Sequence, residues 1–442
     1  MILPRLISII FALVIGLANP AHAISLLRDA DMEYALRQVA KPILTAAGLS
    51  PTQVKILVVD DNGLNAFVID SQHIFLNAGL IMKLKTAASL QAVIAHEAAH
   101  ITNGHLARRP ANMRSARTAA GLGTALAAVA GAASGNGQAA AAIALGSQGT
   151  ALRLFLSHTR AEEAAADISS VRFMKRAGVD PQGAVDVQEI FRGQELLHES
   201  RQDPYMRSHP LSRDRLRALK GLVAGNPGGR ENTSTEYWFA RARGKLSAFK
   251  RAPSWTLRRS KESLTQDIRL MREAAAHHRQ SNLSKALKAI DGAIAIRPKD
   301  PYLRELKGQI LLESRKFDQA VAVYAQAAKM APRNALILGG LGRAQLAAGQ
   351  YKASLRTLEA ARSRDFSDAR ILRDLAVAYA RQKKHGMASL ATAERYALQG
   401  RLKDAGIHAK RASDQLARGS GPWQRAQDVL HAAKQAQRKR RR

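Results

Sequence analysis

The chain has 442 residues, of which 46% are hydrophobic, a share typical of folded proteins that excludes a wholly disordered chain. Its formal net charge is +33, from 68 Lys and Arg against 35 Asp and Glu, which favours anionic partners such as anionic lipid, nucleic acid or acidic protein surfaces. Cysteine is absent, which excludes disulfides and thiolate metal sites. A chain of this length has room for two or three domains.

Residues 1–23, MILPRLISIIFALVIGLANPAHA, have the pattern of a secretory signal peptide. Arg5 supplies a basic start, an apolar run follows over residues 6–18, and Ala21-His22-Ala23 supplies the small-x-small ending. An uncleaved anchor helix would need roughly 20 apolar residues, and this run is shorter. We therefore expect cleavage after Ala23 and export, which argues against nucleic acid as the natural partner.

The first part of the mature chain predicts a mixed α and β structure. Residues 24–49 have the apolar spacing of a helix. Three strand-like segments follow, at 54–61, 64–70 and 73–80, and the turn residues 60–63 separate the first two. From Ser89 the apolar pattern returns to the helical period.

Residues 118–146 consist almost entirely of Ala, Gly and small apolar residues, broken by SGNGQ. The pattern favours a hairpin of two helices that pack closely on their neighbours. Contact with a membrane is the alternative, because each half is too short to span one. A Pro/Gly/Asn-rich loop at 225–235 then precedes an expected helix at 236–249.

Beyond about residue 265 the sequence repeats with a period of 34. Ala286 recurs as Ala320 and then as Ser354, and Gly308 recurs as Gly342. A small residue, an Ala-aromatic pair and a closing proline at this period are typical of tetratricopeptide helix pairs. We expect an α-solenoid over 263–420, followed by a basic C-terminal tail over 421–442 that frays at its end, KQAQRKRRR.

The motif HEAAH at 96–100 predicts a metal site. On a helix His96 and His100 lie on one face, so both imidazoles can bind one ion. Glu97 is rotated by about 100° from His96, as expected for a carboxylate that meets a metal-bound water. An exposed helix that carries two histidines by chance is the alternative, so a third ligand has to be found. Downstream, an acidic helical segment offers Glu162, Glu163 and Asp167.

These motifs together resemble the gluzincin metallopeptidases, in particular a secreted branch with C-terminal tetratricopeptide repeats. ISLLRDADMEYALR, LNAFVIDSQHIFLNAGLI and SHPLSRDRL carry the resemblance beyond the two helical motifs, over nearly the whole mature chain. The resemblance implies one Zn²⁺ per chain, bound by His96, His100 and Glu163, with Asp167 supporting a ligand. It also implies a mostly α fold with an α+β protease domain over 24–262.

The resemblance assigns roles to further residues. Glu97 would act as the general base, His209 would approach the metal in gating or transition-state stabilisation, and Arg215 belongs to the same motif. The segment Asn65-Ala66-Phe67-Val68 is a candidate edge strand on which an extended substrate could add. His105 is expected to continue the helix and to serve a structural or supporting role rather than to bind the metal. Two departures, Ala98-Ala99 and Ala165, leave the ligands intact and concern substrate preference.

The expected function is a zinc endopeptidase of the bacterial periplasm, close to the outer membrane, that cleaves misfolded or stalled envelope proteins. Its repeats would dock substrates or outer-membrane assembly machinery, because such arrays form concave peptide-binding surfaces. The alternative is a chaperone or scaffold with a latent metal site that a plugging His209 would keep closed. A third possibility is peripheral contact with anionic membrane through the basic surface.

Overall fold

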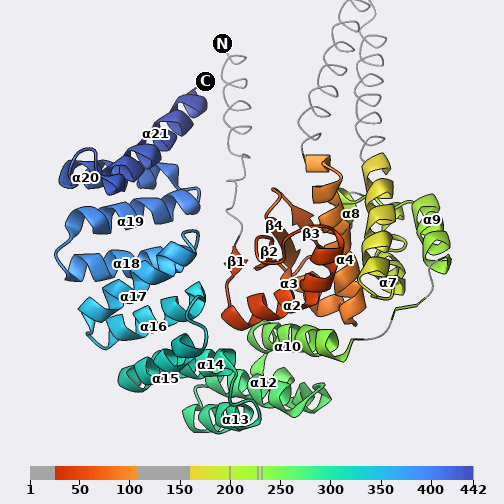
Figure 1. Cartoon of the computed structure of the whole chain (residues 1–442), viewed down its shortest axis with the longest axis horizontal. Coiled ribbons are helices and arrows are strands. Elements are labelled where there is room, and N and C mark those ends of the chain that lie inside the picture. Colours follow the sequence, from red (N-terminus) through yellow and green to blue (C-terminus); the bar gives the residue numbers. More distant parts are fainter. Residues whose placement is uncertain (1–24, 107–159, 199–200, 226–227, 230–231, 442) are drawn as a thin grey trace, which may run out of the picture. The chain divides into compact units, whose positions relative to one another are not determined.

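The computed structural model describes residues 25–106, 160–198, 201–225, 228–229 and 232–441. The expected signal peptide and the segment 118–146 lie outside these residues. The described chain forms two compact units, one over Leu26–Gln382 and one that contains Lys383–Arg442. Among the described helices, none combines the length and the apolar character that crossing a bilayer requires. The fold is mostly α with one small sheet (Figure 1).

The N-terminal half of the larger unit combines the sheet with a set of helices. Its elements are β1 (Leu26–Leu27), α2 (Ala30–Ala46), β2 (Lys55–Val59), β3 (Ala66–Val68), β4 (His73–Asn77), α3 (Ala78–Lys83), α4 (Ala87–Thr102), a helix over 160–176, α7 (Gln182–Ile190), η1 (Gln194–Leu196), α8 (Pro204–Ser208), α9 (Arg213–Ala224) and α10 (Thr233–Lys250).

The sheet has the strand order β1-β2-β4-β3, so β1 and β3 are its edges. β2 and β4 are parallel, whereas β1 and β3 pair antiparallel to their neighbours. The three expected strands are present but shorter than predicted. The fourth strand, β1, replaces the start of the helix expected from residue 24, because Asp29 caps α2 by accepting a hydrogen bond from Met32 N at 2.8 Å.

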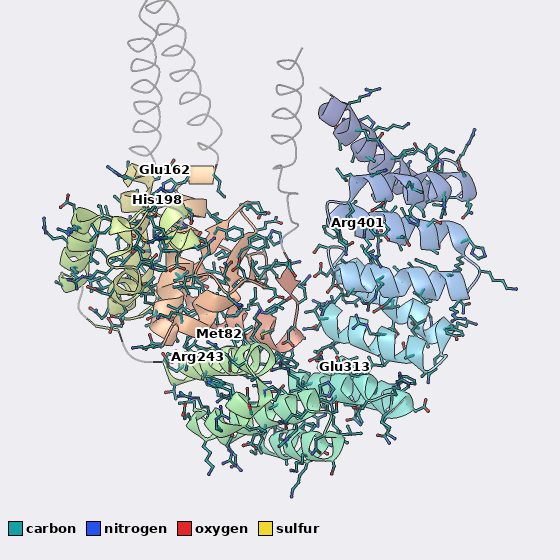
Figure 2. The ribbon with its side chains drawn as sticks, turned by 180° about the vertical axis from the view of Figure 1, so that it is seen from behind. Met82, Glu162, His198, Arg243, Glu313 and Arg401 are labelled. Carbon is teal, nitrogen blue, oxygen red and sulfur yellow. The ribbon has the colours of Figure 1, made fainter. Side chains whose placement is uncertain are left out.

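One face of the sheet carries the core. Alternate residues of β2 and β4, such as Ile56, Val58, Ile74 and Leu76, are buried against α2 and α4 in a single hydrophobic cluster. Gly79 follows β4 because a Cβ there would lie 1.9 Å from the carbonyl oxygen of Asn62. The segment expected as a strand to residue 80 therefore turns into α3 after Asn77. The end of α3 meets α10, where Arg243 donates to Leu84 O at 2.8 Å (Figure 2).

The repeat region confirms the period of 34. Its elements are α11 (Pro253–Arg259), η3 (Ser260–Glu262), α12 (Gln266–Arg279), α13 (Leu283–Ile296), α14 (Pro301–Glu313), α15 (Phe317–Met330), α16 (Ala335–Ala347), α17 (Tyr351–Arg364) and α18 (Ala369–Arg381). A Cβ at Gly308 would lie 2.7 Å from the Tyr324 ring, and one at Gly342 would lie 2.5 Å from Leu358. The period therefore follows from close helix contact, where a bulky side chain of one helix needs a glycine on the next.

The smaller unit contains α19 (His385–Leu398), α20 (Leu402–Gln415) and α21 (Gly421–Arg441). The fraying expected for KQAQRKRRR is therefore wrong for 434–441, because α21 continues to Arg441. Ala426 and Ala433, seven residues apart on one face of α21, are both buried. Ala426 packs in a cluster with Leu390 and Ala412. These small residues hold a helix in place despite its many basic side chains.

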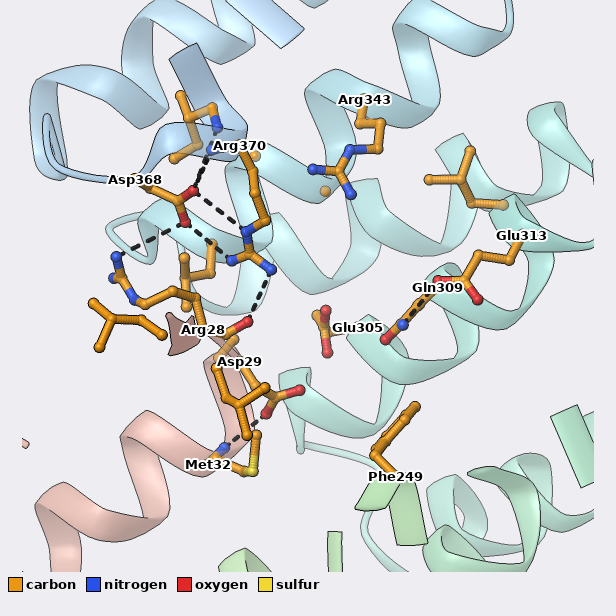
Figure 3. Close-up of a pocket in the computed structure, with 18 of the residues that line it drawn as sticks. Arg28, Asp29, Met32, Phe249, Glu305, Gln309, Glu313, Arg343, Asp368 and Arg370 are labelled. Carbon is orange, nitrogen blue, oxygen red and sulfur yellow. Dashed lines mark hydrogen bonds and ion pairs between the residues drawn. The ribbon is translucent and has the colours of Figure 1, made fainter. Parts of the chain in front are cut away.

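Buried ion pairs join the N-terminal half of the larger unit to its repeats. Lys245 of α10 is fully buried, and its Nζ lies 2.9 Å from Asp29 Oδ2 and 3.6 Å from Glu305 Oε2. Burial raises the pKa of Glu305 to about 7, although the Lys245 charge opposes this. At a second contact, Arg28 binds Asp365 at 2.6 Å. Arg370 donates to Arg28 O at 2.9 Å beside Asp368 (Figure 3).

We expect Lys245→Met to lower the free energy of unfolding by about 3–5 kcal/mol, because it leaves buried carboxylates without a partner. Urea denaturation of the mature protein at neutral pH measures this. The control Lys250→Met removes a partly exposed pair with Asp60 and should cost less than about 1 kcal/mol. Adding Glu305→Gln to Lys245→Met should restore part of the loss. Equal effects of the two lysine variants would contradict the buried role of Lys245.

Candidate metal centre

Helix α4 supplies two imidazoles to one point. Thr86 caps the helix through a hydrogen bond from Ser89 N at 3.1 Å, and the apolar residues around the motif bury its middle turns. His96 Nε2 and His100 Nε2 lie 3.1 Å apart, and each residue is at most 4% exposed. Around a tetrahedral ion with Zn–N bonds of about 2.0–2.1 Å, two nitrogens lie roughly 3.3 Å apart. The two nitrogens are thus already spaced as ligands of one ion.

The helix over 160–176 adds the carboxylate. Glu163 is 1% exposed, with Oε2 at 3.1 Å from His96 Nε2 and Oε1 at 3.2 Å from His100 Nε2. Glu162 is only partly buried and lies outside the group of potential ligands. Spacing alone left three acidic residues as candidates for the third ligand. The geometry places Glu163 against both imidazoles.

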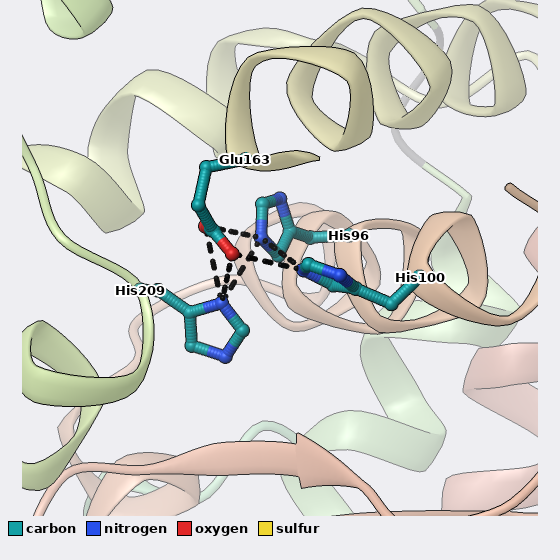
Figure 4. Close-up of side chains that lie close together, drawn as sticks. All are labelled: His96, His100, Glu163 and His209. Carbon is teal, nitrogen blue, oxygen red and sulfur yellow. Dashed lines mark hydrogen bonds and ion pairs between the residues drawn. The ribbon is translucent and has the colours of Figure 1, made fainter. Parts of the chain in front are cut away.

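His209, which follows α8, is the fourth member of this cluster. Its Nδ1 lies 3.0 Å from Glu163 Oε1 and 3.4 Å from His96 Nε2. Donor atoms of all four buried residues lie within 4.8 Å of one another (Figure 4). The other ring nitrogen, Nε2, lies 3.3 Å from the carbonyl oxygen of Ala66 and 3.4 Å from Glu97 Oε1. His209 therefore stands between the cluster, the edge strand β3 and the expected general base.

The outer nitrogens of the imidazoles have partners of their own, which fixes the rings. His96 Nδ1 lies 3.2 Å from Asp167 Oδ1, and His100 Nδ1 lies 2.9 Å from His105 Nδ1. A ring that donates its Nδ1 proton outward presents the lone pair of Nε2 inward. Two such lone pairs and the Glu163 carboxylate then face one point, a donor set that suits a divalent cation such as Zn²⁺.

The residue His105 was expected to continue the helix, and the structure corrects this. Helix α4 ends at Thr102, and Gly104 adopts φ +71°, which turns the chain back. The turn returns His105 to the back of His100 instead of extending it beyond the ligands. The expected supporting role remains compatible with this position.

The buried carboxylates of the cluster favour a positive charge beside them. Burial opposes protonation of His96, but the Glu163 and Asp167 carboxylates outweigh it and raise its pKa to about 10. Burial lowers the pKa of His100 to about 3, so this ring is neutral. Burial also opposes ionisation of Glu163, yet His209 and His96 hold its pKa well below the usual range. Without a metal ion, a proton on His96 supplies the charge that a cation would provide.

Arg215 of α9 contacts Asp167 and Glu163 and holds both side chains in place. Its Nε and Nη2 contact the two oxygens of Asp167 at 2.6 and 2.9 Å, and its Nη1 lies 3.0 Å from Glu163 Oε2. Burial opposes ionisation of Asp167, but the Arg215 charge lowers its pKa. The arrangement orients Glu163 directly and His96 through Asp167, as supporting residues around metal sites do.

Two contacts of this site were not predicted from the sequence. Tyr205 is buried, and its ring centre lies 4.6 Å from that of His209. Its N–H donates to Leu64 O at 3.0 Å, which ties α8 to the segment before β3. The second is the Ala66 carbonyl, a backbone atom that no residue type reveals. Of the four candidate substrate-binding residues, Ala66, Phe67 and Val68 form β3, and Asn65 precedes it and accepts from Ser208 Oγ at 3.2 Å.

We expect Asp167→Asn to weaken zinc binding by about 10–100-fold, because the variant keeps the shape but loses the charge that supports His96 and Arg215. Competition with a calibrated chelator measures the affinity. Glu162→Gln, five residues earlier on the same helix, removes one carboxylate outside the cluster and should leave the affinity unchanged. A similar loss in both variants would show that only the net charge matters.

Comparisons with known proteins agree with this site. The profile of Peptidase family M48 matches residues 30–223, and a tetratricopeptide repeat profile matches residues 311–376. The beta-barrel assembly-enhancing protease of Escherichia coli (strain K12) is 24% identical over 412 residues, which cover 89% of this chain and 81% of the relative.

Two further relatives align over less than half of this chain. A Vibrio cholerae protein with the name "Putative beta-barrel assembly-enhancing protease" is 27% identical over 206 residues, which cover 46% of this chain and 41% of the relative, less than half of its length. The mitochondrial metalloendopeptidase OMA1 of Schizosaccharomyces pombe is 28% identical over 41% of this chain and 50% of the relative. Residues 30–223 therefore match Peptidase family M48, tetratricopeptide repeats follow them, and the chain is homologous to the beta-barrel assembly-enhancing protease of Escherichia coli.

Proposed function

We propose that this chain is a zinc-dependent endopeptidase of the bacterial cell envelope that cleaves misfolded or stalled envelope proteins. The observation that carries the proposal is the buried group of His96, His100 and Glu163, with Glu97 beside it and fully buried. Two neutral imidazoles and one carboxylate are the ligands that catalytic zinc sites use. Bound zinc would supply a water of lowered pKa and would polarise the carbonyl of the peptide bond.

Glu97 is the residue that would move the proton. Its carboxylate follows the first ligand on α4 and lies 3.4 Å from His209 Nε2. Fully buried carboxylates are poorly solvated, which makes them better proton acceptors than exposed ones. Glu97 would take the proton from the attacking water and deliver it to the nitrogen of the departing amine.

Strand β3 would hold the substrate. It pairs with β4 on one side and is an edge of the described sheet. An extended peptide could add to its other side and place a carbonyl close to Glu97. Only unfolded or locally disordered segments can pair in this way, which supports misfolded proteins as substrates. His209 Nε2 contacts the carbonyl of Ala66 on this strand, so substrate and His209 would compete for it.

The repeats would dock substrates or outer-membrane assembly machinery. A cavity of about 570 Å³ lies where α2 and α10 meet α14, α16 and α18, and its walls carry side chains of both charges, such as Glu305, Arg343 and Arg370 (Figure 3). Charged walls of this kind suit a polar segment of a partner protein. The signal-peptide pattern of residues 1–23 supports a periplasmic location, and the net charge of +33 supports peripheral contact with anionic membrane.

The test is cleavage of casein by the mature protein, residues 24–442, beside Glu97→Gln, with bound metal quantified in both. We expect about one zinc per chain in each protein. We expect the rate of cleavage to fall by at least about 10²-fold in the variant, because the general base is gone. The control Glu162→Gln should cleave like the unsubstituted protein. Absence of zinc from both proteins would contradict the proposal.

The alternative function is a chaperone or scaffold with a latent metal site, and the contacts of His209 favour it specifically. Because His209 holds both the Ala66 carbonyl and Glu163, we expect His209→Ala to raise basal casein cleavage. A loss of about 10²–10³-fold would instead assign His209 to transition-state stabilisation. If neither the unsubstituted protein nor His209→Ala cleaves casein although both bind zinc, the result would support the chaperone or scaffold function. Tyr205 is kept in all of these variants, because its ring packs against the His209 ring.

A further inference from the structure

A second site of unusual composition lies in the larger unit, on elements other than α4 and the 160–176 helix. It is a cavity of about 440 Å³ between the end of α3, α10, α11, η3 and the start of α12. Cavities of this size are typical of small-molecule sites. We call it the arginine pocket, because its lining includes five cationic side chains, Lys85, Arg243, Arg251, Arg259 and Arg272.

The two acidic side chains that line the arginine pocket offset this charge only in part: Glu236 acts on Arg243 and Glu262 acts on Arg272. Glu236 accepts a hydrogen bond from Ala87 N at 2.8 Å and so caps helix α4. Glu262 lies at the rim, where its side chain is 63% exposed and contacts Arg259 at 3.4 Å. Exposed pairs of this kind contribute little. The pocket therefore keeps an excess of positive charge.

Arg272 is part of the wall, and one of its buried donors lacks an acceptor. The residue is 8% exposed, and its Nη1 donates to Arg259 O at 3.1 Å and to Ser263 Oγ at 2.7 Å. Its Nε is buried, and within the described part of the chain it has no hydrogen-bond acceptor. A buried guanidinium with an unused donor costs free energy that an anionic acceptor would recover.

The neighbouring helix holds this guanidinium in place. A Cβ at Gly244 of α10 would lie 3.2 Å from Arg272 Cδ, so the absence of a side chain lets Arg272 lie against α10. Arg243, one residue earlier, donates to Leu84 O and lies over the Phe239 ring at 5.1 Å. Burial lowers the pKa of both arginines, although the Glu236 and Glu262 carboxylates oppose this, and the Arg243 charge lowers the pKa of Arg272 further. Two like charges, one buried at Arg272 and one partly buried at Arg243, thus line one cavity.

The outer wall of the arginine pocket is apolar and aromatic. The guanidinium carbons of Arg251 and Arg259 lie 5.7 and 5.5 Å from the centre of the Trp255 ring. Leu264, at the same rim, is 57% exposed. The pocket therefore offers cations at its inner wall and an indole with an aliphatic side chain at its mouth, which suits an anion that carries an apolar part.

We propose that the arginine pocket binds a phosphate group, either as free phosphate or as the headgroup of an anionic phospholipid. Guanidinium groups are the side chains best suited to phosphate oxygens, because they donate two parallel hydrogen bonds. Arg272 and the other cationic side chains of the arginine pocket would bind the oxygens. Trp255 and Leu264 would contact the glycerol and acyl part of a lipid.

The experiment is calorimetric titration of the full mature protein at constant ionic strength. The probes are inorganic phosphate, dihexanoyl phosphatidylglycerol below its micellar concentration, and dihexanoylglycerol, which lacks the phosphate. We expect saturable binding of the first two and none of the third. Tighter binding of the phospholipid would identify a headgroup site, and equal affinities would identify free phosphate.

The variants assign the binding to the arginine pocket. Arg243→Gln and the exposed double variant Arg251→Gln with Arg259→Gln should each weaken binding at least tenfold. Arg217→Gln removes the same charge from α9, where the side chain is 81% exposed, and should bind like the unsubstituted protein. The double variant changes exposed residues and should therefore fold, so it still tests the proposal if Arg243→Gln does not fold. No saturable binding, or an equal loss in Arg217→Gln, would overturn the proposal.

Discussion

The ion pair of Arg215 with Asp167 is the interaction on which the metal centre depends. It joins α9 to the helix over 160–176 by two short hydrogen bonds, and a third nitrogen of the same guanidinium reaches Glu163. Asp167 then contacts His96 of α4. These contacts fix the relative positions of three helices that are distant in sequence. The interior that surrounds them is well packed, so a shift of any one would be resisted by the others.

Much of this arrangement could be predicted from periodicity. The helical period places His96 and His100 on one face with Glu97 beside them, and the repeats follow from small residues that recur every 34 positions. Spacing could not choose among Glu162, Glu163 and Asp167, because a helix in isolation does not reveal which of its faces meets α4. The resemblance to gluzincins made that choice, and the geometry agrees with it.

The features that sequence analysis missed share a physical cause. The Ala66 carbonyl is a backbone atom, so its contact with His209 leaves no trace in residue type. Strand β1 has only two residues, too few for a period to appear, and it exists because β2 offers an edge. In α21 the basic side chains suggested a frayed tail, whereas two buried alanines on one face decide the outcome. Each of these features depends on a tertiary contact that the local sequence does not reveal.

The contact between His209 and β3 also bears on selectivity. His209 belongs to the same chain as the strand, so it is present at a high and constant effective concentration. If a substrate adds to β3 as proposed, it would replace His209 only by forming several backbone hydrogen bonds at once, since one bond gains little over the contact that is lost. Length and extended conformation would then matter more than side-chain identity at any one position. A short peptide with a good cleavage motif would be a poor ligand, and a long unstructured segment would be a good one whatever its sequence.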